Sequence, residues 1–71
     1  MGQPFRALRE AAGISLRELS RRTGWVENGE SSPDSINPGR LSLIERGVAP
    51  TEQEATILKR LLGELLTGAA A

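Results

Sequence analysis

Arginine is the residue type in this chain whose chemistry points most directly to a ligand. Eight of the nine basic side chains are Arg, and the ninth is Lys59. A planar guanidinium can hold a phosphate group or the edge of a guanine through two parallel hydrogen bonds, whereas an ammonium acts more as a point charge. Arginines also commonly do no more than solvate a helix surface. Their arrangement along the chain must therefore decide between a binding role and a solubilising one.

Composition excludes most other chemistries. The 71 residues include no Cys and no His, so the chain alone cannot build a disulfide, a zinc site, a thiolate nucleophile or an imidazole base. The nine acidic residues are scattered and lack the alternating Asp/Asn pattern of a calcium loop. A chain of this length buries only about 60% of its unfolded surface, which leaves little room for an enzyme cleft. We therefore expect a binding protein with no catalytic residue, no metal and no cofactor.

The net charge of zero is the sum of unlike segments. Residues 1–24 hold five Arg and two Glu, a balance of +3, whereas residues 25–34 hold three acids and no base, a balance of −3. The remaining residues are balanced. Because backbone phosphates attract basic surfaces, the first segment is the one suited to a nucleic acid. The acidic segment should then point away from the phosphates or limit non-specific binding.

The sequence gives no sign of a membrane or export signal. No apolar run approaches the roughly 18 residues that span a bilayer. The N-terminus also lacks a basic stretch followed by an apolar one. We expect a cytoplasmic protein.

Four helices, or five if the last is interrupted, are expected to position the arginines. The first should cover residues 4–12, beginning near Pro4, and the next two should end before Gly24 and Gly47. The last helix has its large apolar residues three and four positions apart, which is the spacing of one helix face. Gly63 could break or kink this helix, and the Ala-rich tail after it should fray.

Three helix starts carry recognisable caps. Ser15 with Glu18, and Thr51 with Glu54, have the spacing of a capping box, in which the hydroxyl and the carboxylate each accept a backbone N–H at the helix start. Asn37 followed by Pro38 is a typical cap and first helical residue. These patterns predict helices that begin at residues 16, 38 and 52.

Residues 25–35 lack any helical or strand periodicity and are expected to form a loop. The segment is rich in turn formers, and Asn28-Gly29 could close a tight hairpin, but the flanking residues do not alternate as strands do. Trp25 has two interpretations. It could cover the small core, which we favour, or it could be an exposed anchor for another protein.

Two segments resemble a known family. Residues 8–24, LREAAGISLRELSRRTG, and residues 36–47, INPGRLSLIERG, are similar to the helix-turn-helix family of phage repressors, Cro proteins and bacterial XRE-type regulators. Residues 50–62, PTEQEATILKRLL, resemble the helix that follows in that family. The most specific parts of the match are residues 13–19 and residues 41–47, and the latter have the family's L-S-x-I-E-x-G pattern. The resemblance implies a single all-α domain, residues 1–71, of four to five short helices. The family's turn of about three or four residues is replaced here by an eleven-residue insert, 25–35.

The resemblance also implies roles for individual residues. Residues 15–22 would form the supporting helix and residues 38–46 the recognition helix in the major groove. Bases would face Pro38, Gly39, Arg40 and Leu43, with Arg40 as the chief reader because Pro and Gly offer no side-chain hydrogen bond and Leu can only touch a thymine methyl. Phosphates would be contacted by Ser15, Arg17, Asn37, Ser42 and Arg46.

Three further arginines have different expected roles. In the family an Arg late in the first helix often pairs with the Glu of the I-E motif, which implies a structural Arg9–Glu45 bridge rather than a DNA contact. Arg21 and Arg22 could contact phosphate or only solvate a helix face, and the resemblance does not settle which.

The function implied is sequence-specific DNA binding by a small transcriptional regulator that acts by occupying an operator. Such regulators usually act as homodimers. Leu62, Leu65 and Leu66 offer apolar surface for a dimer, although they could equally belong to the core. The alternative is a protein-interaction module, such as an antitoxin or accessory factor, that docks on a partner protein through the acidic, Trp-bearing insert.

Overall fold

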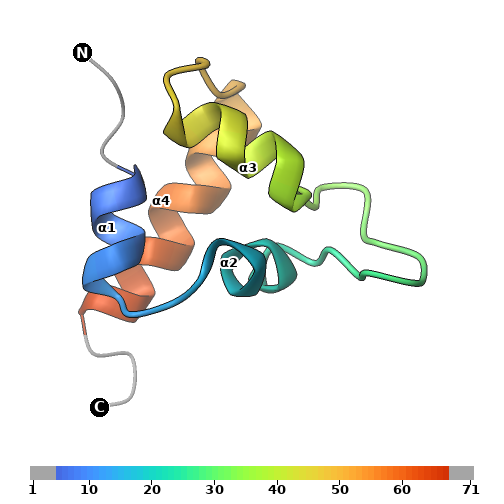
Figure 1. The fold of residues 1–71 in the computed structure, drawn as a ribbon, viewed down its shortest axis with the longest axis horizontal. Coiled ribbons are helices and arrows are strands. Elements are labelled where there is room, and N and C mark those ends of the chain that lie inside the picture. The colour runs from blue at the N-terminus through green and yellow to red at the C-terminus, as the bar shows by residue number, and fades with distance from the viewer. Residues whose placement is uncertain (1–4, 68–71) are drawn as a thin grey trace.

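The computed structural model describes residues 5–67, which fold into four helices without any strand (Figure 1). The helices are α1 (Phe5–Ala11), α2 (Leu16–Arg22), α3 (Pro38–Glu45) and α4 (Glu52–Leu66). The all-α fold expected from the sequence is therefore confirmed. The expected helix start at Pro4 and the end of the Ala-rich tail lie outside the described residues.

The predicted cap residues begin α2, α3 and α4, but the capping box predicted at α2 is incomplete. The Asn37 side chain accepts the Arg40 N–H at 2.8 Å, and Thr51 and Glu54 exchange the two bonds of a complete capping box. At α2 the Ser15 hydroxyl accepts the Glu18 N–H at 3.0 Å, but the Glu18 carboxylate does not accept the Ser15 N–H in return. That carboxylate lies instead 3.2 Å from the Arg22 guanidinium, because an ion pair one turn along the helix competes for it.

Gly63 does not interrupt α4, contrary to the kink considered from the sequence. The helix runs unbroken to Leu66. The glycine is exposed and an added Cβ there would meet nothing within 4 Å. Leu62 beside it is fully buried, and Leu65 packs on the core. Packing on both sides of the glycine thus outweighs its weak helix propensity, which is worth about 1 kcal/mol.

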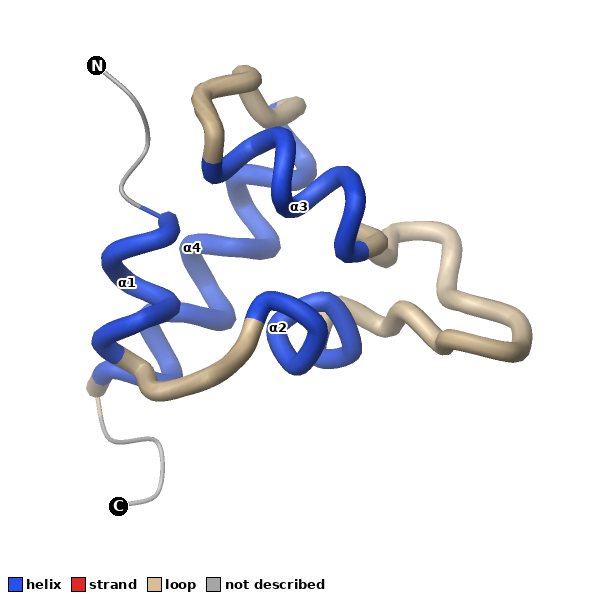
Figure 2. Tube along the Cα trace, in the orientation of Figure 1, coloured by secondary structure: helices blue, strands red, loops and turns tan. Residues whose placement is uncertain are grey.

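The core lies where the four helices meet. α1 packs along α4 and touches α3, and α2 packs on α3. In Figure 2, α1 lies at the left and α2 and α3 at the right, and α4 runs from behind α3 to the end of α1. The buried apolar residues of the core come from every helix and from Ile36, just after the insert: Phe5, Leu19, Ile36, Leu41, Ile44, Leu58 and Leu62.

The insert between α2 and α3 forms a long loop that extends away from the helices (Figure 2). Its two arms are joined by bonds from the Ser32 N–H to the Gly24 carbonyl (3.1 Å) and from the Val26 N–H to the Ser31 hydroxyl (2.8 Å). No strand forms between residues 5 and 67, so these bonds close a turn and not a hairpin ladder. The loop ends at Ile36, which is 2% exposed and therefore fastens the insert to the core.

Trp25 does not cover the core, so the favoured interpretation is wrong. It is half-buried, and it is not among the partly buried apolar residues that pack on the core. Its ring lies instead beneath the Arg17 guanidinium, whose carbon is 6.0 Å from the ring centroid. The residue that closes the core at this point is Ile36, whose carbonyl accepts the buried Ser20 hydroxyl.

None of the helices between Phe5 and Thr67 is long and apolar enough to cross a membrane.

Candidate nucleic-acid interface

α3 is held against its neighbours by an ion pair on each side. The first is the predicted Arg9–Glu45 bridge, which joins α1 to the end of α3. Arg9 Nε lies 2.7 Å from one carboxylate oxygen of Glu45, and its Nη2 lies 3.1 Å from the other. The two side chains are only 14% and 6% exposed. Arg9 also donates to the Ile14 carbonyl at 3.0 Å, so one guanidinium joins α1, the α1–α2 turn and α3.

The second ion pair joins the start of α3 to α4 through Arg40. Its Nε and Nη2 donate to the two carboxylate oxygens of Glu54 at 2.9 and 2.8 Å. Glu54 simultaneously caps α4 through the Thr51 N–H, at 2.8 Å. The hydrogen bonds from Arg40 are the main reason that the pKa of Glu54 is lowered, and the same bonds raise the pKa of Arg40. The guanidinium expected to read bases is therefore engaged within the domain.

The lowered pKa of Glu54 gives stability a defined dependence on pH. A carboxyl with a lower pKa in the folded state stabilises the fold above its ordinary pKa of 4.5 and loses that contribution as the pH falls through the folded-state value. Glu54→Gln should therefore lower stability at neutral pH and weaken the loss of stability below about pH 4.5. Urea unfolding of both proteins across this pH range measures the effect. The prediction would be contradicted if the free energy of unfolding fell with decreasing pH by the same amount in the wild type and in Glu54→Gln.

The outward side of α3 carries the remaining predicted contacts. Leu43 is 43% exposed, and Arg46, which caps the helix end, is exposed and forms no ion pair with any residue from 5 to 67. Ser42 is half-buried. Of the residues at the helix start, Gly39 is exposed and Pro38 is half-buried, and Asn37 Oδ1 accepts the capping N–H.

The predicted phosphate contacts on α2 are also partly engaged. The Ser15 hydroxyl accepts the capping N–H, although an oxygen of this kind can still donate its proton to a ligand. Arg17 Nη1 lies 2.6 Å from a carboxylate oxygen of Glu27 in the insert. The sequence predicts that the acidic segment either points away from the phosphates or limits non-specific binding. Glu27 does not point away, because opposite charges draw this part of the loop onto the basic face of α2.

The three leucines considered for a dimer have different surroundings. Leu62 is fully buried in the core, so it is not available to a second subunit, and Leu65 packs on the same core. Leu66 is 39% exposed. The helix periodicity turns residues 58, 62 and 65 inward together, which leaves Leu66 as the member of the set with accessible surface.

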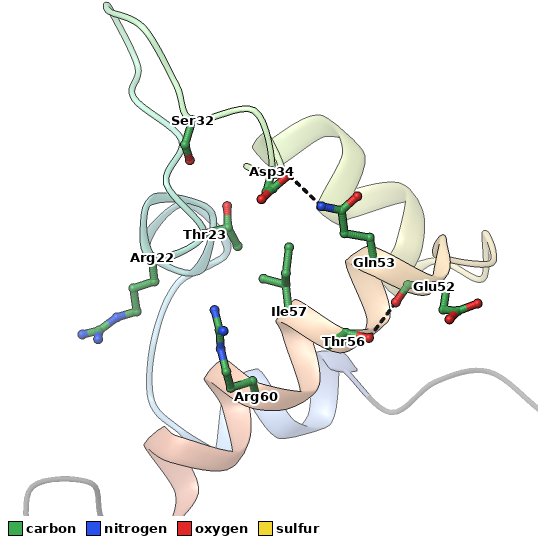
Figure 3. Close-up of a pocket in the computed structure, with 9 residues that line it drawn as sticks. All are labelled: Arg22, Thr23, Ser32, Asp34, Glu52, Gln53, Thr56, Ile57 and Arg60. Carbon is green, nitrogen blue, oxygen red and sulfur yellow. Dashed lines mark hydrogen bonds between the residues drawn. The ribbon is translucent and has the colours of Figure 1, made fainter.

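A hollow of about 600 Å³ is lined by residues other than the predicted base and phosphate contacts, apart from Arg22, whose role the sequence left open (Figure 3). It is bounded by the end of α2, the second arm of the insert and the first half of α4. Oppositely charged side chains line it, including Arg22 and Arg60 against Asp34 and Glu52. Sequence reasoning did not find this hollow. The only signal for it was the unusual length of the insert, which supplies one wall.

No protein-family model matches this chain, and no curated protein or solved structure matches it. The assignment of a function therefore depends on the resemblance of the motif residues and on the side-chain arrangement around α3.

Proposed function

We propose that this domain is a sequence-specific DNA-binding transcriptional regulator of the small phage repressor or Cro type, which acts by occupying an operator. The observation that carries the proposal is the setting of α3. The helix is braced against α1 by Arg9–Glu45 and against α4 by Arg40–Glu54, while Leu43 and Arg46 remain exposed on it. A rigid helix with an exposed side is what insertion into a major groove requires.

The dimensions of α3 suit this role. With its side chains, an α-helix such as α3 is about 10 to 12 Å in diameter. The major groove of B-DNA is about 12 Å wide and accepts a helix. In the proposed complex Arg46 would contact a phosphate, and Leu43 would lie against a base edge, where it can touch a thymine methyl.

Direct reading of bases should be sparse in this complex. Arg40 keeps only Nη1 without a hydrogen bond to residues 5–67 while it is bound to Glu54. Pro38 and Gly39 beside it provide no side-chain donor or acceptor. Part of the specificity would then come from the shape and deformability of the operator, with Gly39 allowing the backbone to approach the DNA closely.

The proposal is tested by fluorescence anisotropy with a duplex selected from a random pool and with a mixed-sequence duplex, across a salt series. We expect tighter binding to the selected duplex and a modest salt dependence, because few phosphates are contacted per subunit. Arg46→Gln should weaken binding to both duplexes by a similar factor and reduce the slope of log affinity against log salt by about 1.

The matched control is Arg60→Gln, which removes the same charge from α4, at the hollow shown in Figure 3. It should leave the affinity and the slope close to the wild-type values. Absent or salt-insensitive binding by the wild-type protein would contradict the proposed function.

A further inference from the structure

Two arginines of α2 converge on one carboxylate oxygen of the insert. Oε1 of Glu27 lies 2.6 Å from Arg17 Nη1 and 3.8 Å from Arg21 Nη2. The two guanidinium groups are one helical turn apart, so they lie on the same side of α2. Two cations around a single oxyanion form the arrangement that also binds a phosphate oxygen.

The loop is built to bring Glu27 to this place. Gly24, with φ of +106°, starts the insert in a backbone conformation that other residues rarely adopt, and a Cβ there would lie 2.0 Å from the Ser32 hydroxyl. Trp25 follows, with its ring beneath Arg17. The bond between the Val26 N–H and the Ser31 hydroxyl then turns the chain back. Glu27 thus follows the indole that lies beneath Arg17 and belongs to the turn that Val26 and Ser31 close.

The ion pair is nevertheless accessible to solvent. The Arg17 and Glu27 side chains are 53% and 47% exposed. Exposed pairs of this kind contribute little to stability, so this one can open without unfolding the domain. Its negative member is tethered to the chain and therefore competes at a high effective concentration with any anion from solution.

We infer that Arg17 and Arg21 form a phosphate-binding site that the insert itself occupies, with Glu27 as an internal substitute for a backbone phosphate of DNA. This inference rests on the proposed function and adds a regulation to it. A DNA phosphate can bind Arg17 and Arg21 only after Glu27 leaves. The insert therefore lowers affinity for DNA in general, and an operator must supply enough other contacts to displace it.

The chain offers a matched pair of variants for the test. Glu27→Gln and Glu30→Gln each remove one negative charge from the same loop, but Glu30 forms no ion pair with residues 5–67. With a mixed-sequence duplex, Glu27→Gln should tighten binding by about two- to fivefold, the factor that corresponds to removing an exposed ion pair. The salt slope should steepen by about 1 for each phosphate newly contacted. Glu30→Gln should change both quantities much less.

Two outcomes of this experiment would overturn the inference. One is an equal gain in affinity for Glu27→Gln and Glu30→Gln, which would make net charge the cause. The other is a gain from Glu27→Gln that persists when Arg17→Gln is added, which would show that the released arginine is not the group that binds. Unchanged helical circular dichroism establishes that the variants fold alike.

A second probe separates this inference from the proposed function. Trp25 is the one Trp of the chain and lies beside Arg17, so its fluorescence reports on the site. Inorganic tripolyphosphate should bind Glu27→Gln more tightly than it binds the wild type or Glu30→Gln. If no duplex binds while this difference is found, the proposed function fails and the anion site stands. Equal affinity of the three proteins for tripolyphosphate would overturn the inference, regardless of whether any duplex binds.

Discussion

Glu45→Gln is expected to lower the free energy of unfolding by about 3 to 5 kcal/mol, the usual result of removing one partner from a buried ion pair. Glu45 is 6% exposed and receives two hydrogen bonds from Arg9, which is itself 14% exposed. Without the carboxylate, a largely buried guanidinium loses its counter-charge. Because small domains are stable by only about 5 to 15 kcal/mol, the loss should remove a large part of the total.

Urea and thermal unfolding measure this effect. For a domain of this size, each kcal/mol corresponds to about 4 to 8 °C in Tm. The control is Glu10→Gln, which breaks the Arg6–Glu10 pair on α1, the helix that also carries Arg9. The Arg6 and Glu10 side chains are 68% and 57% exposed. That change should cost about 1 kcal/mol or less. A loss no greater for Glu45→Gln than for Glu10→Gln would contradict the role assigned to the buried pair.

A double replacement distinguishes the destabilisation caused by an unpaired charge from the net contribution of the ion pair to the free energy of unfolding. Arg9→Met combined with Glu45→Leu removes both charges and keeps apolar volume at both positions. Its destabilisation should be well below the sum of the two single losses, because neither charge is left without a partner. Additive losses would show that the two side chains act independently.

Leu62→Ala is expected to destabilise the domain by about 2 to 5 kcal/mol, the range measured when a buried Leu is truncated and a cavity remains. Leu62 is fully buried among the apolar residues that join α4 to the other helices. Leu66, one turn further along the same helix, is 39% exposed. Leu66→Ala should therefore cost only about 1 kcal/mol or less, as is usual for changes at the surface.

The same two variants separate a core role from a dimer role. If Leu66 contributes to a dimer, Leu66→Ala should lower the dimer fraction in sedimentation experiments without the loss of fold stability seen for Leu62→Ala. A monomeric mass for the wild type at micromolar concentration, both free and with the selected duplex, would reject the dimer. Similar stability losses for the two variants would contradict the burial difference on which the comparison depends.

The helix starts and the apolar side of α4 could be predicted from the sequence because they depend on neighbours three or four residues away. Asn37 caps α3 and Thr51 caps α4 through bonds to the third residue along. The chain itself holds such partners together once a helix forms. The Arg9–Glu45 bridge spans 36 positions, and it could be expected only from the family resemblance.

The availability of Arg40 and Arg17 was decided by the tertiary structure. Arg40 has the residue type and position of a base reader, yet the packing of α4 against the bundle brings Glu54 to it from 14 positions away. Arg17 meets Glu27 for a similar reason, since the path of the insert returns one acid to the basic side of α2. Local patterns specify which groups a helix carries. Ion pairs one turn apart, such as Arg22–Glu18, follow from the spacing within a helix. Only the three-dimensional arrangement of helices and loops specifies which opposite charges on different elements meet, because a guanidinium pairs with whatever carboxylate the fold places within reach.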